Sequence, residues 1–313
     1  MLKKLNLHIY IVLAIFIATF IVGSFFDYQI NDALFHEKDT FGLVISVIGT
    51  IPGYGILAFM GGGLFYLALK DKIPTKVGRI LGYAFAVITF GLAIFFSGRE
   101  LFGPNGFYWI GVQKFWGYFI VFPVHVGIAF LGFKMTSNSD YDKLWLVYAV
   151  IAIVILICLV AGVTLLKSIF HRPRFRSIME YGSLPGMVYH NWWEPCKEYK
   201  DIIASDPSKT LLSEEFKSFP SGHAGTAAVF MMSALVLPII NKKYENTSIV
   251  IFYIGLAWTI LVAFSRMYVG AHFLSDVSMG TLLTVITFFI AKIVMENVKY
   301  FGLSNKDLEK GNE

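Results

Sequence analysis

The chain has 313 residues, of which 56% are hydrophobic and only 15% are charged. With a mean hydropathy of +0.65, it lies outside the range of soluble globular proteins and is predicted to reside in a lipid bilayer. Its net charge of +5 is small, and Lys and Arg gather between apolar stretches, which favours membrane topology and an anionic substrate over nucleic acid. The two cysteines provide neither a disulfide framework nor zinc-ligand spacing.

Apolar stretches long enough to cross a bilayer recur along the whole chain. They occupy residues 8–26, 43–69, 80–97, 115–135, 144–166, 224–240, 248–264 and 275–298. The sequence therefore predicts an all-α, polytopic transmembrane bundle of about eight helices. Lys3 and Lys4 precede the first stretch, as in a signal peptide, but no small-residue cleavage site follows. We therefore expect a retained helix.

Two features inside these stretches favour structural roles. The second stretch is rich in glycines, five of which predict close helix packing, and it contains a proline, which predicts a kink. They are Gly53, Gly55, Gly61, Gly62, Gly63 and Pro52. His125 lies within the fourth stretch, where we favour a neutral, hydrogen-bonded imidazole over a functional group.

Positive charges predict the orientation of the chain. Lys and Arg precede the first stretch and recur at 70–79, 242–243 and 299–310, which eight crossings place on one side. The positive-inside rule makes this side cytoplasmic. Both termini are then cytoplasmic, whereas the long loop 167–223 and the segment 265–276 are extracytoplasmic. The long loop is itself basic, but long loops are translocated largely regardless of charge.

The first extracytoplasmic loop is predicted to be acidic. It holds Asp27, Asp32, Glu37 and Asp39. Farther along, the long loop contains a group of large side chains, Met187, Tyr189, Trp192, Trp193 and Tyr199. These side chains suit either a lip in the headgroup region or the packed core of a small subdomain, and both interpretations remain open.

Three polar clusters lie at the ends of apolar stretches on the predicted extracytoplasmic side. The first runs from Lys167 to Arg176 and holds four cations in ten residues. Such cations either extend toward lipid headgroups or form a pocket for phosphate.

The second cluster is Pro220-Ser221-Gly222-His223, directly before the sixth stretch. Ser221 is the expected N-cap of a helix, whose unpaired N–H groups and dipole favour an anion. Gly222 would let an oxygen approach the backbone closely, and His223 could protonate a leaving oxygen. The alternative is an ordinary capped helix with an incidental histidine.

The third cluster, Ser265 to Asp276, contains Arg266 and His272. In a helix, His272 and Asp276 lie one turn apart on one face. The carboxylate could then accept a hydrogen bond from one imidazole nitrogen and leave the other free to attack. Arg266 offers a fork of donors for phosphate. The alternative is a helix-end histidine with an ordinary salt bridge.

Together the clusters supply two histidines, a carboxylate, several cations and a helix N-terminus. This set suits phosphoryl transfer through a phosphohistidine, since fixed donors stabilise the charge on the equatorial oxygens without a metal ion.

These motifs resemble those of the type-2 phosphatidic acid phosphatase superfamily. The family pattern is Lys-x6-Arg-Pro, then Pro-Ser-Gly-His, then Ser-Arg-x5-His-x3-Asp. The second motif matches fully at Pro220–His223 and the third at Ser265–Asp276. The first places Lys167 and Arg174 at the family spacing with Phe175 in place of proline, whereas alignment on Arg172 shortens the spacing by two residues.

The resemblance implies a role for each matching residue. His272 would be the nucleophile, Asp276 would orient it, and His223 would protonate the leaving group. The phosphate oxygens would be bound by Lys167, Arg174, Ser221, Gly222 and Arg266, with Arg172 assisting.

The resemblance also implies an integral-membrane phosphatase for a lipid phosphate or diphosphate, in a bacterial plasma membrane, with no metal or cofactor. Undecaprenyl diphosphate, phosphatidic acid and phosphatidylglycerol phosphate all suit such a site. Its expected partners are this substrate and membrane lipids. A lipid phosphotransferase or a sugar-phosphate phosphatase could use the same residues. A non-enzymatic membrane scaffold fits least, because the second and third motifs are complete.

We expect three regions. Residues 1–140 would hold N-terminal helices, including two added to a six-helix family core. Residues 141–300 would form the phosphatase core of four helices with its extracytoplasmic loop 167–223, and residues 301–313 a polar tail.

Overall fold

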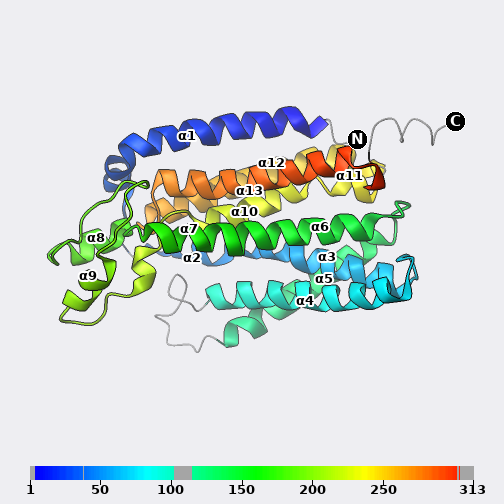
Figure 1. Cartoon of the computed structure of the whole chain (residues 1–313), viewed down its shortest axis with the longest axis horizontal. Coiled ribbons are helices and arrows are strands. Elements are labelled where there is room, and N and C mark those ends of the chain that lie inside the picture. The colour runs from blue at the N-terminus through cyan, green and yellow to red at the C-terminus, as the bar shows by residue number, and fades with distance from the viewer. Residues whose placement is uncertain (1–3, 38, 102–114, 302, 304–313) are drawn as a thin grey trace.

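A computed structural model describes residues 4–37, 39–101, 115–301 and 303. Every regular element within these residues is a helix, and eight helical segments are long and apolar enough to cross a membrane. The predicted all-α transmembrane bundle is therefore confirmed (Figure 1).

The N-terminal half contains α1 (Lys4–Leu34), α2 (Thr40–Ile48), α3 (Ile51–Leu69), α4 (Lys76–Leu101) and α5 (Trp116–Thr136). One continuous crossing follows, built from α6 (Leu144–Leu156), the π-helix η2 (Ile157–Gly162) and α7 (Val163–Phe170). The long loop contains α8 (Phe175–Tyr181), α9 (Tyr199–Ser205) and the short 3₁₀ helix η3 (Ser213–Phe216). The last part consists of α10 (Gly222–Ser233), α11 (Leu237–Ile240), η4 (Lys242–Tyr244), α12 (Glu245–Tyr268), α13 (Leu274–Asn297) and η5 (Lys299–Phe301).

Helix α10 is the centre of the bundle. It packs against α3, α12 and α13 and is buried along most of its length. Helix α1 packs along α13, and α3, α4 and α5 pack on one another. Figure 1 shows α8 and α9 at one end of the bundle, opposite the end where α1 begins and α13 stops.

The first helix is longer than predicted. It continues to Leu34, so Asp27 and Asp32 are helical and do not belong to a loop. The physical reason is that Asp27 and Asn31 face protein and are buried at 1% and 0% exposure. A polar side chain in a membrane helix is tolerated where it faces partners inside the protein. Asp39 does lie between helices, and its carboxylate caps α2 by accepting the N–H of Gly42.

The glycine-rich stretch packs closely, as predicted. A Cβ added at Gly53 would lie 1.9 Å from the carbonyl oxygen of Thr226 in α10, and one at Gly62 would lie 1.8 Å from that of Ala129 in α5. The predicted kink at Pro52 is corrected: α2 ends at Ile48, and the proline occupies the first turn of the separate helix α3. Proline suits that position because the first turn needs no N–H donor.

The long loop has a small core of its own. Its buried residues are Met187, Cys196, Ile202, Leu211 and Phe216. Tyr199 packs against this core, whereas Trp193 remains 45% exposed. Trp192 instead donates its indole N–H to Ser24 of α1 at 2.8 Å. Of the two interpretations of these large side chains, the packed core of a small subdomain therefore holds for Met187 and Tyr199.

His125 is structural. Its Nε2 lies 3.1 Å from the hydroxyl of Ser97, and its Nδ1 lies 2.8 Å from the carbonyl oxygen of Val121. Both ring nitrogens are thus satisfied. Most of the predicted polar tail, residues 302 and 304–313, lies outside the described residues.

Candidate active site

The three polar clusters come together at the α8–α9 end of the bundle. Lys167 lies in the last turn of α7, His223 in the first turn of α10, and Arg266 in the last turn of α12. His272 lies in the short turn between α12 and α13, and Asp276 in the first turn of α13. The backbone N–H of Ser221 donates to the carbonyl of Asp276 at 2.9 Å, which joins the second cluster to the third.

A backbone carbonyl determines the orientation of His272. Its Nδ1 lies 2.6 Å from the carbonyl oxygen of Ser218, so Nδ1 carries the proton and donates it. Nε2 makes no hydrogen bond to any residue that the structure describes. The carboxylate of Asp276 lies farther away, with Oδ2 at 3.7 Å from Nδ1. It instead accepts a 2.5 Å hydrogen bond from the hydroxyl of Ser218. Orientation of His272 by Asp276 thus remains a prediction, with Ser218 as an additional contact.

Asp276 connects the start of α13 to the rest of the site. Its Oδ2 accepts the N–H of Phe273 at 2.8 Å, which caps the helix, and its Oδ1 accepts from Arg172 at 2.6 Å. A carboxylate in the first turn is also stabilised by the helix dipole.

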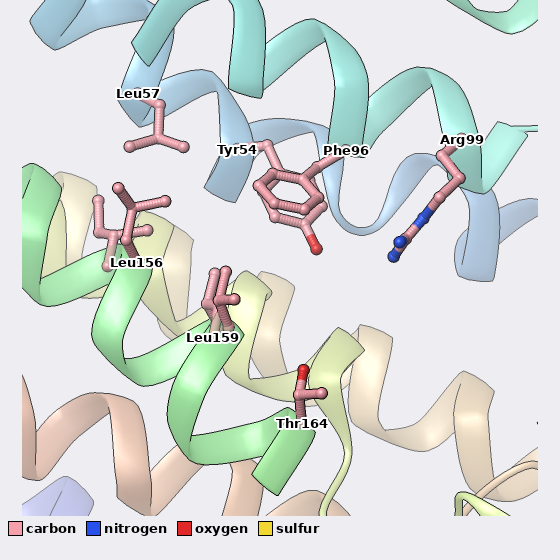
Figure 2. A pocket seen from close by; sticks show the side chains of 9 residues that line it. Tyr54, Leu57, Phe96, Arg99, Leu156, Leu159 and Thr164 are labelled. Carbon is pink, nitrogen blue, oxygen red and sulfur yellow. The ribbon is translucent and has the colours of Figure 1, made fainter. Parts of the chain in front are cut away.

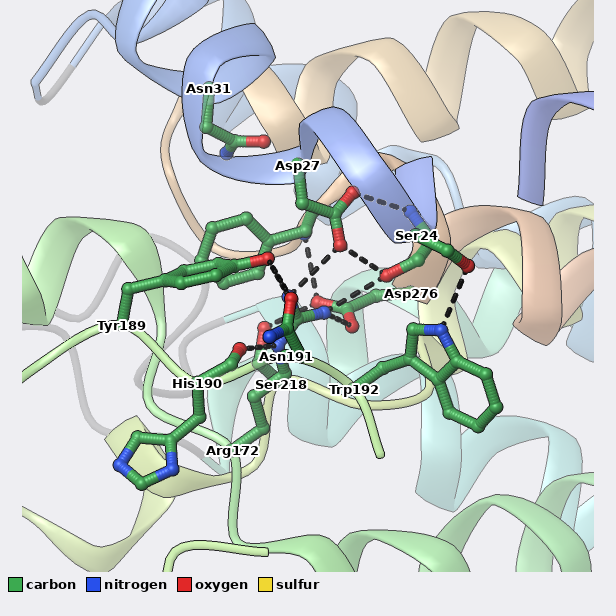
Figure 3. A network of polar contacts seen from close by, with 12 residues as sticks. Ser24, Asp27, Asn31, Arg172, Tyr189, His190, Asn191, Trp192, Ser218 and Asp276 are labelled. Atoms are coloured by element: carbon green, nitrogen blue, oxygen red, sulfur yellow. Dashed lines mark hydrogen bonds and ion pairs between the residues drawn. The ribbon is translucent and has the colours of Figure 1, made fainter. Parts of the chain in front are cut away.

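Arg172 lies at the centre of this network (Figure 3). Its five N–H groups donate to the carbonyl of His190, the hydroxyls of Ser275 and Tyr189, and the carboxylates of Asp27 and Asp276. A guanidinium has five N–H donors in all. These contacts do not favour the prediction that Arg172 assists in binding phosphate, which stays a prediction.

Arg174, the other arginine of the first motif, remains predicted to bind phosphate. It is buried, and its Nε donates to the carbonyl of Glu214 at 3.1 Å. Lys167 is anchored similarly, donating to the carbonyl of Lys217 at 2.7 Å. Burial lowers the pKa of His272 well below its ordinary value, and the positive charges of Lys167, Arg174 and Arg266 add to this effect against the hydrogen bond of Asp276. His272 is accordingly a neutral imidazole.

Glu215 holds the arginine segment in place. Its carboxylate accepts two hydrogen bonds from Arg176, at 2.9 and 2.6 Å, and one from Ser177 at 2.5 Å. Although burial opposes the shift, the charge of Arg174 and these bonds lower the pKa of Glu215 to about 2. The N–H of Arg174 also donates to the carbonyl of Glu215.

The second motif begins α10 as predicted. Ser221 is the N-cap, and its hydroxyl accepts from the N–H of Ala224 at 3.4 Å. A Cβ added at Gly222 would lie 3.5 Å from Val163, an ordinary contact. No described neighbour therefore requires glycine there.

His223 has an acidic neighbour that the sequence did not indicate. Its Nε2 is buried and makes no hydrogen bond within the described residues, and it lies 3.8 Å from Oε2 of Glu100. Glu100 comes from the last turn of α4. A carboxylate in the last turn of a helix is unfavourable, because the helix dipole is negative at that end. This unfavourable placement was the sequence feature that could have drawn attention to Glu100.

A cavity opens beside the site, between α3 and α4 on one side and α6, η2 and α7 on the other (Figure 2). Its volume is about 530 Å³, including its open mouth. Its exposed lining is almost equally polar and apolar, and its apolar members include Leu57, Phe96, Leu156, Leu159 and Val160. Tyr54, Arg99 and Thr164 are its polar members. Arg99 lies 3.1 Å from Glu100, so the polar part of the cavity is adjacent to His223.

Within the described part of the chain, no three His, Cys, Asp or Glu side chains are grouped to hold a metal ion. The positive charge of the site comes from Lys167, Arg174 and Arg266.

Comparison with known proteins gives one relative. The chain is 35% identical over 110 residues to phosphatidylglycerophosphatase B of Bacillus subtilis (strain 168), a match that covers 34% of this chain and 52% of the relative. It thus spans about half of that relative's own length. No solved structure matches. The family model of the PAP2 superfamily matches residues 143–300, slightly more than half of the chain and all three motifs, so the chain belongs to the PAP2 superfamily.

Proposed function

We propose that this protein is an integral-membrane phosphatase that hydrolyses a lipid phosphate or diphosphate through a phosphohistidine. One observation carries the proposal. The buried, neutral His272 holds its proton on Nδ1 against the Ser218 carbonyl. Its Nε2 is left available for attack, at the same end of the bundle as the buried Nε2 of His223.

The first step transfers the phosphoryl group to His272. Nε2 attacks phosphorus, the N–P bond forms, and the bond to the leaving oxygen breaks. His223, whose protonated form is favoured by the charge of the bound phosphate and by the Glu100 carboxylate, donates its proton to that oxygen. Lys167, Arg174, Arg266 and the N–H groups at the start of α10 stabilise the charge on the equatorial oxygens.

The second step returns the enzyme to its starting state. His223 accepts a proton from water, the hydroxide attacks phosphorus, and the N–P bond breaks to release inorganic phosphate. Glycine at position 222 keeps the backbone open for a phosphate oxygen. Charge stabilisation in this scheme comes from protein cations, so we expect turnover to persist in a chelator.

Two features favour a lipid substrate over a soluble sugar phosphate. The site lies at the end of a transmembrane bundle, and the apolar wall of the cavity beside it, which includes Leu57 and Leu159, offers contacts to a hydrocarbon chain. The name of the bacterial relative, phosphatidylglycerophosphatase B, points to a phosphorylated lipid.

The site is proposed to face the extracytoplasmic side of a bacterial plasma membrane. The Lys- and Arg-containing connections 70–79 and 242–243 lie at the opposite end of the bundle from α8 and α9. By the positive-inside rule, that opposite end is cytoplasmic.

The test is phosphate release from a panel of lipids by purified protein and by His272→Ala. We expect the parent to release phosphate from phosphatidylglycerol phosphate, phosphatidic acid or undecaprenyl diphosphate. His272→Ala should be slower by more than about a thousandfold, because it removes the nucleophile. The control is His190→Ala, whose ring points away from the network (Figure 3).

A trapped intermediate would extend this test. Brief reaction with labelled substrate should leave an acid-labile, alkali-stable label on the parent and none on His272→Ala. Equal phosphate release by both proteins would contradict the nucleophile assignment. Phosphoryl transfer to an added alcohol without release to water would indicate a phosphotransferase instead.

A further inference from the structure

One face of α1 lies against the catalytic turn. Gly23, Asp27 and Asn31 are spaced four residues apart, so they share one side of the helix. This helix lies outside residues 143–300, the part that matches the family.

The contacts of this face are specific. Asp27 accepts the N–H of Ser275 through Oδ1 at 2.9 Å, and through Oδ2 it accepts the Ser275 hydroxyl and Nη2 of Arg172, the latter at 2.9 Å. Asn31 donates to the carbonyl of His272 at 3.0 Å. A Cβ at Gly23 would lie 2.5 Å from the nitrogen of Ser275, so only glycine allows this approach.

We propose that Asp27 is a positioning residue for the reaction, which acts through Arg172 and Ser275 to hold the Asp276 carboxylate and the His272 turn. This inference rests on the proposed phosphatase function. It gives α1, which lies outside the family match, a catalytic purpose (Figure 3).

Charge balance supports this role. Arg172 pairs with Asp27 at 2.9 Å and with Asp276 at 2.6 Å, and all three side chains are buried. With both carboxylates ionised, the group carries a net negative charge, whereas Arg172 and Asp276 alone would be neutral. The His272 ring gains positive charge as it takes the phosphoryl group, and a negative charge nearby stabilises that change.

The free-energy cost of placing the Asp27 carboxylate in a transmembrane helix also indicates that this residue has a function. An ionised carboxylate in a transmembrane helix is expensive unless it is paired, and such residues commonly mark functional sites. Asp32, five residues later on the same helix, is exposed and makes no contact with the Arg172 network. It therefore provides a matched control for the loss of one acidic charge from α1.

The experiment compares full-length Asp27→Asn and Asp32→Asn with the parent. Asparagine keeps the shape of Asp27 and removes its charge. We expect kcat to fall about tenfold to a hundredfold for Asp27→Asn. Losses of this size follow when a residue that orients a metal-binding side chain is removed, and Asp27 supports His272 in the same indirect way. The inhibition constant of inorganic phosphate should stay within about twofold, because Asp27 does not touch phosphate. Asp32→Asn should match the parent in both.

The pH profile separates positioning from simple structural support. The charged groups that face His272 are Lys167, Arg174, Arg266, Asp276 and His223, and Asp27→Asn changes none of them. Removing the negative charge of Asp27 should lower the pKa of the nucleophile further. The acid limb of kcat/KM should therefore move to lower pH in Asp27→Asn only.

Two results would overturn the inference. One is unchanged kcat and pH profile in Asp27→Asn; the other is loss of phosphate binding together with thermal stability, which would indicate a purely structural residue. Hydrogen exchange in Asp27→Ala provides a readout that needs no turnover. Amides of residues 272–276 should exchange faster than in the parent, and unchanged exchange would also refute positioning. A parent protein that releases no phosphate would instead refute the proposed function.

Discussion

Two neighbouring arginines of this site, Arg172 and Arg174, differ in what they contact. They are separated by one proline and are both buried, yet Arg172 forms ion pairs with two carboxylates, whereas the charges around Arg174 are mixed, with Arg176 against Glu214, Glu215 and Glu100. The pairing of Arg172 with Asp27 and Asp276 makes it part of the protein's internal support. Arg174, with Lys167 and Arg266, forms the positive surroundings of His272.

The support role predicts a stability effect. Arg172→Ala would leave two buried carboxylates without their cation, which costs about 3–5 kcal/mol of unfolding free energy. Denaturant unfolding in detergent micelles would measure the loss. The control is Arg79→Ala, whose ion pair with Asp71 is largely exposed and contributes less than about 1 kcal/mol. Equal stability of the two variants would contradict the assignment.

At the scale of elements, close helix crossings bring the site together. Helix α3 meets α10 at Gly53 and α5 at Gly62, in both cases against a backbone carbonyl. The π-helix η2 lies between α6 and α7 in one crossing, and its residue Leu159 lines the cavity. Such π-helical turns are frequent at functional sites.

Crowding at these crossings is testable with Gly62→Ala. The new methyl group would collide with the Ala129 carbonyl, and overpacking of this kind costs about 1–3 kcal/mol. Gly91→Ala is the control, because nothing lies within 4 Å of a Cβ there, and alanine is about 1 kcal/mol better than glycine inside a helix. Thermal unfolding should therefore shift in opposite directions for the two variants, and a shared direction would contradict the packing argument.

At the scale of the whole molecule, helices outside the family match surround the reaction centre. Helix α1 supplies Asp27, α4 brings Glu100 to His223, and α3 and α4 close one side of the cavity. The N-terminal region thus contributes to the site from several directions.

The cavity predicts selective loss of lipid turnover in Leu159→Trp. Filling the space with an indole should lower kcat/KM at least about tenfold for a long-chain lipid phosphate, because the hydrocarbon chain loses its apolar contacts. Hydrolysis of a short, water-soluble phosphate ester should be unchanged. Leu165→Trp, at a position 60% exposed on α7, is the control. An equal loss on both substrates would show that the cavity does not hold the chain.

Local patterns in the sequence were sufficient to predict the bundle and to locate the main polar clusters. A crossing requires a long apolar run, and the complete motifs containing His223 and His272 each occupy a short segment at a helix end. The boundary at Asp27 was wrong because a lone carboxylate normally ends an apolar stretch. Its buried partners, Arg172 and Ser275, lie 145 and 248 positions away.

The sequence by itself determined a polytopic membrane protein with a phosphate-directed set of histidines and cations. Only the tertiary structure showed that Arg172 and Arg174 have different contacts, and only it brought Asp27 and Glu100 to the site. The physical reason is that hydropathy and motif spacing act within a few helical turns. The partner of a buried charge, in contrast, depends on which distant helices pack together.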